Sequence, residues 1–153
     1  MLSKERMMKN ILIGTIIFLL IGGCNKYEDG PTISFVSPID RITNSWKYDE
    51  VFRNGLDITA GEQTQDLIYT KSSIGFAEDG RFSYIEDYRD SALETGDGFW
   101  EFNDNKTIIT LIYDDANKPN RTLNLTRLER RFLWFSENLN GNNVLTFKMV
   151  SNE

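Results

Sequence analysis

The sequence predicts an all-β domain, a small antiparallel up-and-down barrel of about eight strands. Short runs with alternating apolar and polar residues fill positions 45–150, and turn residues separate them. No stretch after residue 24 carries a sustained apolar period of 3.6 residues, and 59–65 could form no more than a helical turn. A β-sandwich is the alternative arrangement of such strands.

The first 23 residues differ from the rest of the chain and are typical of a secretory signal peptide. Lys4, Arg6 and Lys9 form a basic start, and the apolar run 11–23 follows, with Thr15 as its only polar member. Thirteen residues cover about 20 Å as a helix, whereas a hydrocarbon core is about 30 Å thick. The run is therefore too short for a typical membrane-spanning helix.

The run ends in Ile21-Gly22-Gly23-Cys24, and Cys24 is the single cysteine of the chain. This tetrapeptide resembles the bacterial lipobox. The resemblance implies that Cys24 receives a diacylglycerol on its sulfur and becomes the first mature residue, so that the membrane is a partner through this lipid. Two or three acyl chains give stable anchoring, whereas a single chain is marginal.

Cys24 is followed by Asn25 and not by Asp, so the common inner-membrane retention signal of bacterial lipoproteins is missing. The resemblance therefore implies an envelope protein of the outer membrane, with the leaflet left open. Residues 24–43 contain Pro31 and Pro38 and are interpreted as a lipidated tether. Ile33, Phe35 and Val36 could still add a short strand or plug.

The barrel domain is expected to span 44–153. Its first strand covers 46–52, and 67–69 and 74–76 bracket a second. The further strands are expected at 81–88, 99–102, 107–113, 121–128, 132–135 and 144–150. Hairpin turns are predicted at 78–80, 103–105 and 140–142, which combine Asp, Asn and Gly as tight turns require.

Several short signatures occur in order along these strands. They are Asn44-Ser45-Trp46, the hairpin Phe76-Ala77-Glu78-Asp79-Gly80-Arg81-Phe82, Gly98-Phe99-Trp100 and Leu133-Trp134-Phe135. Together they resemble the lipocalin-like domain common in secreted lipoproteins of Bacteroidetes. Asn44 stands where that family usually has Gly, although Asn tolerates the left-handed backbone that such a turn uses. The resemblance implies a small meander barrel with a pocket at one mouth, and a role in binding and not catalysis.

Large aromatic side chains on the expected inner faces either fill the core of the barrel or form the wall of a site for a small or apolar ligand. The interior of an eight-stranded barrel is just wide enough for its own side chains to fill it, or for one small ligand. A fully packed barrel, acting as a protein interaction or assembly module at the envelope, is therefore the alternative. The candidate ligand-binding residues are Phe82, Tyr84, Trp100, Phe102 and Trp134.

The composition excludes several classes of function. The chain has no His and one Cys, which removes His-based acid–base chemistry, Cys–His sites and Cys/His zinc sites. A net charge of −6 without a basic run predicts no positively charged surface for nucleic acid. We therefore expect a protein that is not an enzyme and holds no metal or cofactor.

One acidic stretch remains to be interpreted. Glu86, Asp87, Asp90, Glu94 and Asp97 cluster within twelve residues, and we expect a solvated loop because glycosidase carboxylates need a defined separation across a cleft. The triplet Asp90-Ser91-Ala92 resembles the O-glycosylation motif of Bacteroidetes, which makes Ser91 a candidate modification site.

Overall fold

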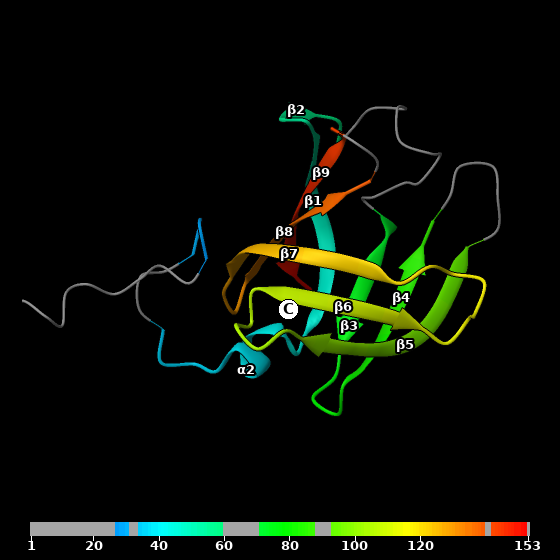
Figure 1. Cartoon of the computed structure of the whole chain (residues 1–153), viewed down its shortest axis with the longest axis horizontal. Coiled ribbons are helices and arrows are strands. Elements are labelled where there is room, and N and C mark those ends of the chain that lie inside the picture. The colour runs from blue at the N-terminus through cyan, green and yellow to red at the C-terminus, as the bar shows by residue number, and fades with distance from the viewer. Residues whose placement is uncertain (1–26, 31–33, 60–70, 88–92, 140–141, 153) are drawn as a thin grey trace, which may run out of the picture.

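The computed structural model describes residues 27–30, 34–59, 71–87, 93–139 and 142–152. Within them it contains one short helix and nine strands (Figure 1). In chain order these elements are α2 (Pro38–Ile42), β1 (Ser45–Arg53), β2 (Leu56–Asp57), β3 (Ser73–Phe76), β4 (Arg81–Glu86), β5 (Glu94–Phe102), β6 (Ile108–Tyr113), β7 (Arg121–Leu128), β8 (Phe132–Asn138) and β9 (Val144–Ser151).

Eight of the strands close into an antiparallel barrel. Strands β3 to β9 pair with their sequence neighbours, and β1 pairs with β3 on one side and with β9 on the other. The closing register runs from Trp46 opposite Ser151 to Arg53 opposite Leu145. Strand β2 is an extra strand that pairs only with the end of β1. The predicted barrel is confirmed, and the sandwich alternative is wrong.

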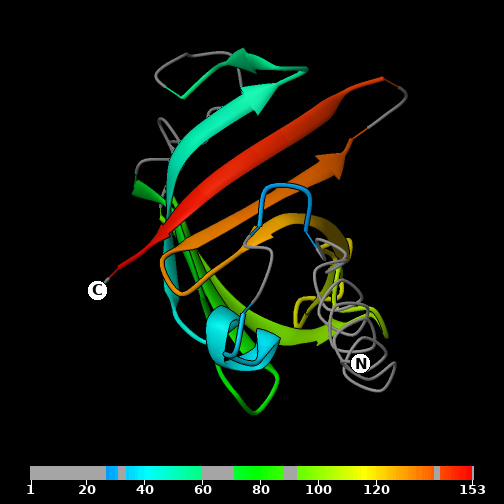
Figure 2. The same ribbon diagram turned by 90° about the vertical axis from the view of Figure 1, so that its left-hand side faces the viewer.

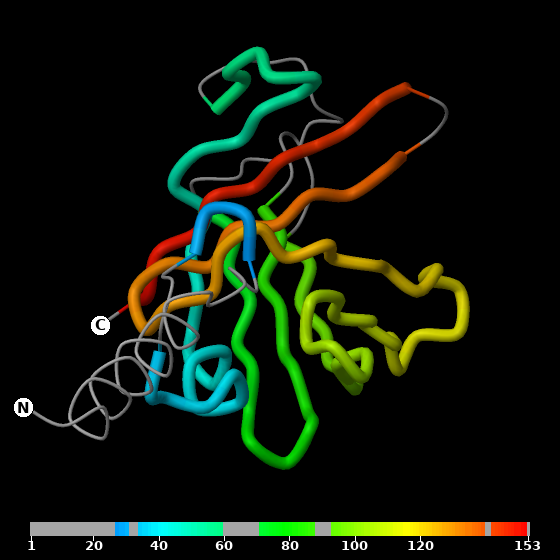
Figure 3. Tube along the Cα trace, turned by 60° about the vertical axis from the view of Figure 1, so that its left-hand side comes forward, coloured from blue at the N-terminus to red at the C-terminus, as the bar shows by residue number. Residues whose placement is uncertain are grey.

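Figure 3 shows β8 and β9 running beside β1 along the same wall. The pairing of β1 with β9 shifts by one residue between Tyr48 and Glu50, and that of β7 with β8 between Leu125 and Arg127. Such bulges bend a strand and increase its twist, which helps a sheet to close.

The interior is filled by the alternating inward residues of each strand. In β4 and β9 every second side chain is buried, as the period of two requires when one face of a strand is covered. The largest side chains with almost no exposure are Trp46, Phe135 and Phe147. Phe135 and Phe147 lie against each other with ring centroids 5.0 Å apart.

Helix α2 covers one end of this interior, and Figure 2 shows it in front of the end that faces the viewer. Ser37 caps the helix by accepting the Asp40 N–H at 3.0 Å, and Pro38 occupies the first turn, where no amide donor is needed. Ile42 is fully buried, and Arg41 donates to the carbonyl of Leu128 at 2.6 Å. Among the described residues, no helix is long and apolar enough to cross a membrane.

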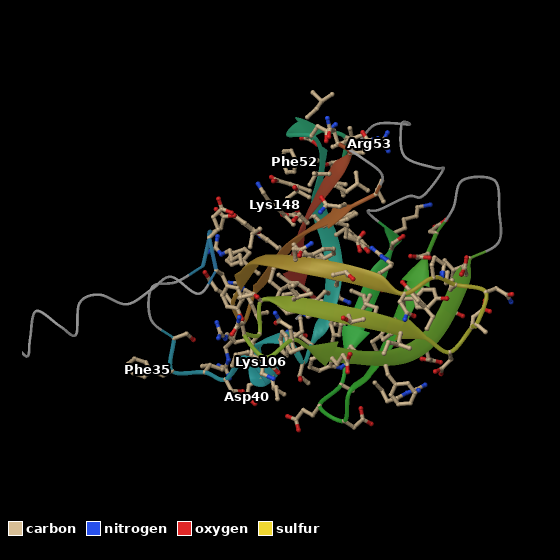
Figure 4. The ribbon with its side chains drawn as sticks, in the orientation of Figure 1. Phe35, Asp40, Phe52, Arg53, Lys106 and Lys148 are labelled. Atoms are coloured by element: carbon tan, nitrogen blue, oxygen red, sulfur yellow. The ribbon has the colours of Figure 1, made fainter. Side chains whose placement is uncertain are left out.

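Part of the stretch interpreted as a tether also contacts the barrel. Tyr27 is 2% exposed and donates from its hydroxyl to the carbonyl of Lys106 at 2.8 Å. The amide of Asp29 donates to the carbonyl of Thr126 at 2.8 Å. Phe35, by contrast, is fully exposed and projects away from the barrel (Figure 4). Ile33 lies outside the described residues.

Gly98 lies within the regular strand β5, not at a bend. A Cβ atom at this position would overlap with the carbonyl oxygen of Ile112 and with the ring of Phe82. The glycine is therefore required by the close approach of two neighbouring strands. Its partner in the motif, Trp100, is 8% exposed and donates from its indole N–H to the carbonyl of Ala77 at 3.0 Å.

We expect Gly98→Ala to lower the free energy of unfolding by about 1–3 kcal/mol because it overpacks this contact. Gly75→Ala is the matched control, since it lies in β3 and its added Cβ would meet nothing closer than Ser83 Oγ at 3.5 Å. That control should be neutral or stabilising by up to about 1 kcal/mol. Urea unfolding of both variants measures the difference, and equal effects would contradict the steric explanation.

Candidate ligand site at the barrel mouth

A pocket opens at the end of the barrel opposite α2. Its volume is about 790 Å³, within the range of about 300–1,000 Å³ that is typical of small-molecule sites. The lining residues come from β1, the last part of β4, β6 and β8, the connections that follow β6 and β8, and the first part of β7 and β9. The apolar and aromatic residues of its lining are Tyr48, Tyr113, Leu139, Leu145 and Phe147.

Arg121 and Glu137 form a bidentate ion pair in the wall of this pocket. Arg121 donates from Nε and Nη2 to the two oxygens of Glu137, with both distances 2.9 Å. A third nitrogen, Nη1, lies 3.4 Å from the hydroxyl of Tyr113 and 3.7 Å from Glu86 Oε1. Paired donors and acceptors in this planar arrangement are the strongest class of side-chain hydrogen bond. The pair therefore holds one guanidinium and one carboxylate in fixed positions in the wall of the pocket.

Lys118 reaches into the same mouth from the connection between β6 and β7. Its Nζ lies 2.9 Å from Glu86 Oε2 and 2.5 Å from Glu94 Oε1. The ammonium also lies 4.1 Å from the ring centroid of Tyr84 and 5.2 Å from that of Tyr113. Two carboxylates and two aromatic faces thus surround one ammonium group.

The surroundings of the two cations keep them charged. Burial opposes the charge of Lys118, but hydrogen bonds with Glu94, Glu86 and Tyr84 outweigh it and raise the pKa above its ordinary value. Burial likewise opposes the charge of Arg121, while attraction to Glu137 raises its pKa well above the ordinary value. Burial also raises the pKa of Tyr84. Lys118 and Arg121 therefore remain charged at neutral pH.

The five aromatic residues predicted as a ligand wall lie elsewhere. Phe82, Tyr84 and Trp100 are at most 8% exposed and belong to the core, and Phe102 packs against that core. The structure brings Phe82 and Tyr84 together, with ring centroids 6.3 Å apart, and Trp100 and Phe102, with centroids 5.4 Å apart. None of the five lines the pocket, and Tyr84 approaches it through its contact with Lys118.

Trp134 lies on the outer face of β8, away from the other four. Its ring centroid is 4.5 Å from the guanidinium of Arg127 and 4.9 Å from Lys148 Nζ. Lys148 in turn lies over Phe52 at 4.7 Å and contacts Glu50 Oε2 at 2.6 Å (Figure 4). Cations and aromatic rings alternate across the outside of β1, β9, β8 and β7, an arrangement that stabilises the wall of the barrel.

The polar residues of the mouth were missed at the sequence level, although the alternation contains a signal for them. Glu86 follows Phe82 and Tyr84 in phase, Glu137 follows Leu133 and Phe135, and Arg121 precedes Leu123 and Leu125. The interpretation of the acidic stretch as a solvated loop is wrong for Glu86, which is 7% exposed in β4. Glu94, in β5, is held by Lys118.

Other predicted features lie outside the described residues: the signal segment 1–23, Cys24, most of the 59–65 turn, the 67–69 run and Ser91. No group of three metal-ligating Cys, Asp or Glu side chains occurs in the described part of the chain.

The sequence matches no protein-family model and no curated protein. Among solved structures, a lipocalin-like protein from Bacteroides uniformis matches with a TM-score of 0.49 and 16% identity, over 72% of this chain and 98% of that one. An uncharacterized protein from Bacteroides eggerthii gives 0.46 and 12%, again over 72% and 98%. Japanin from Rhipicephalus appendiculatus, bound to cholesterol, gives 0.51 and 10%, over 76% and 79%. The japanin match shows a shared barrel fold.

Proposed function

We propose that this protein is a lipid-anchored bacterial envelope protein whose barrel binds a small molecule at the mouth opposite α2. The observation that carries the binding role is the pocket of about 790 Å³, in which Tyr48, Leu145 and Phe147 lie beside charged side chains. Such a mixed lining suits a ligand with a compact apolar body and a polar group.

The shared barrel fold supports this role. Japanin, which has the same type of barrel, is bound to cholesterol in its crystal structure. We infer that this chain also holds a ligand with an apolar part, although its pocket has charged residues in the wall. The protein is proposed to be a binding protein and not an enzyme, since the Lys118 and Arg121 side chains of the pocket are engaged by carboxylates.

The anchor is proposed to be a lipid on Cys24. Tyr27 lies three positions after Cys24, and three fully extended residue steps span about 11 Å at most. Because Tyr27 is bound at the α2 end through Lys106, a lipid on Cys24 would hold this end near the membrane. The mouth lies at the other end of the strands and would face away from the bilayer.

Intact-mass spectrometry of the full chain, extracted in detergent from bacterial membranes, tests both parts of the proposal. Under denaturing conditions we expect a chain that begins at Cys24 and carries the mass of a diacylglycerol. Under native conditions we expect an additional small molecule that is lost on unfolding. Cys24→Ser is the matched control and should remove the lipid adduct while the barrel still forms.

A mature chain with another first residue would contradict the anchor. The alternative, a protein interaction module, would be supported by two results together. The barrel would retain no small molecule, and crosslinking in the cell would return one stoichiometric protein partner. Its contact surface would then be sought on the outer face of β4 to β6, where Phe99 lies opposite Ile112 in the register and both are exposed.

A further inference from the structure

The Lys118 ammonium occupies a site with the chemistry of an amine receptor. Glu86 and Glu94 contact it with one oxygen each, at 2.9 and 2.5 Å, and the rings of Tyr84 and Tyr113 lie within 5.2 Å. Carboxylates and aromatic faces are the two groups that bind an ammonium most favourably in a protein. The Lys118 side chain is 22% exposed and that of Glu86 is 10% exposed, so this cage is partly shielded from water.

The charge balance of the mouth favours a cation over an anion. Lys118 and Arg121 face three carboxylates, those of Glu86, Glu94 and Glu137. With Lys118 in place the set carries one net negative charge, and with Lys118 withdrawn it carries two. An anionic ligand would have to displace a carboxylate from Lys118 or Arg121 and would add to this negative charge, whereas a cationic ligand replaces one ammonium with another.

Lys118 lies outside the paired strands of the barrel, in the connection between β6 and β7. The first residue of this connection is anchored: Asp114 donates from its amide to the carbonyl of Asp97 at 3.0 Å and pairs with Arg81 at 2.7 Å. The backbone N–H of Lys118 donates to the carbonyl of Asp115 within the same turn at 3.0 Å. The other residues of this connection, 114–117 and 119–120, are exposed. Glu86, Tyr84 and Tyr113 belong to strands, so the cage stays in place when the Lys118 side chain withdraws.

We propose that the ligand of this mouth is a small organic cation with a primary ammonium group, and that Lys118 fills the ammonium subsite until the ligand displaces it. This inference rests on the proposed binding function and names its ligand class. The apolar body of the ligand would lie against Tyr48, Leu145 and Phe147, which line the same pocket.

The test uses n-butylammonium as the probe, with n-butanol and butyrate as neutral and anionic controls of the same size. These compounds are water-soluble and suit a full chain held in detergent. Calorimetric titration is carried out on the parent chain, on Lys118→Met and on Lys148→Met. Lys148 is a matched control because it is also held by a carboxylate and aromatic rings, but on the outer face.

We expect Lys118→Met to bind butylammonium about ten-fold more tightly than the parent does, because the internal competitor is gone. Lys148→Met should bind as the parent does. Adding Glu86→Gln to Lys118→Met should reverse the gain, since one of the two carboxylates then carries no charge. Neither butanol nor butyrate should gain affinity in Lys118→Met.

A second measurement does not depend on the folding of any variant. In the parent chain, the NMR signal of the Lys118 Nζ should move toward that of a solvated lysine as butylammonium is added, while the Lys148 signal stays. An unmoved Lys118 signal, or equal binding of butanol and butylammonium, would overturn the amine assignment. A retained neutral or anionic molecule in the intact-mass experiment would leave the proposed binding function standing and remove only this inference.

Discussion

Replacing Trp46 with alanine is expected to lower the free energy of unfolding by about 3–5 kcal/mol, the largest effect of any single truncation proposed for this barrel. Trp46 is fully buried and its indole N–H donates to the carbonyl of Ile42 at 2.8 Å. The change leaves a cavity beside α2 and removes the hydrogen-bond partner of a buried carbonyl. Both losses act on the end of the barrel that the helix covers.

Urea unfolding followed by circular dichroism measures this effect. Trp134→Ala is the matched control, because it removes the same side chain from the outer face, where Arg127 and Lys148 flank it. We expect that control to cost only about 1–2 kcal/mol, the sum of two cation–π contacts between half-buried side chains. Equal losses in the two variants would contradict the assignment of Trp46 to the core and Trp134 to the surface.

Replacing Arg121 with methionine is expected to cost about 2–4 kcal/mol, somewhat less than the loss of one partner from a fully buried ion pair. The reduction reflects the 26% exposure of the Arg121 side chain, because water at the mouth screens part of the interaction. Glu137, whose side chain is 10% exposed, would lose both of its hydrogen bonds to the guanidinium.

The double variant Arg121→Met/Glu137→Met should recover most of that loss, since it removes both charges and keeps side chains of similar size. Chemical denaturation of the two single variants and the double variant gives the coupling directly. If the losses in the free energy of unfolding were additive, Arg121 and Glu137 would stabilise the barrel independently. That result would contradict the bidentate ion pair.

The strands were predictable because their inward faces repeat with a period of two. The expected 46–52, 107–113, 121–128 and 144–150 differ from β1, β6, β7 and β9 by one residue at most at each end. The turn before β4 was also predictable, and Gly80 adopts the positive φ of 83° that it requires. Most strands of the barrel can therefore be predicted from the local alternation of apolar residues and from the turn residues.

Helix α2 and strand β2 were not predicted, since five and two residues are too short to show a period. The capping signal of α2 was nevertheless present in Ser37-Pro38. Burial of Tyr27 could not be predicted, because its hydroxyl contacts Lys106, which is 79 residues away in the sequence.

The candidate site was predicted at the level of its kind but not of its residues. A pocket at one mouth was implied by the family resemblance, whereas large aromatic residues were chosen as its wall. The barrel packs Phe82, Tyr84, Trp100 and Phe102 in or against its core and carries Trp134 on its outer face. Lys118, Arg121, Glu86 and Glu137 lie at the mouth. Their pairing depends on strand register across 16 to 32 residues of sequence, which no local pattern contains.

The most direct test of the central claim is hydrogen–deuterium exchange of the full chain with and without its retained small molecule. If the mouth opposite α2 is the binding site, slower exchange on binding should concentrate in the segments 113–124 and 137–139, which contain most of the residues that line the pocket. Exchange around Trp46 and α2 should not change. Slower exchange only in strand segments away from the mouth, with 113–124 and 137–139 unchanged, would contradict the account.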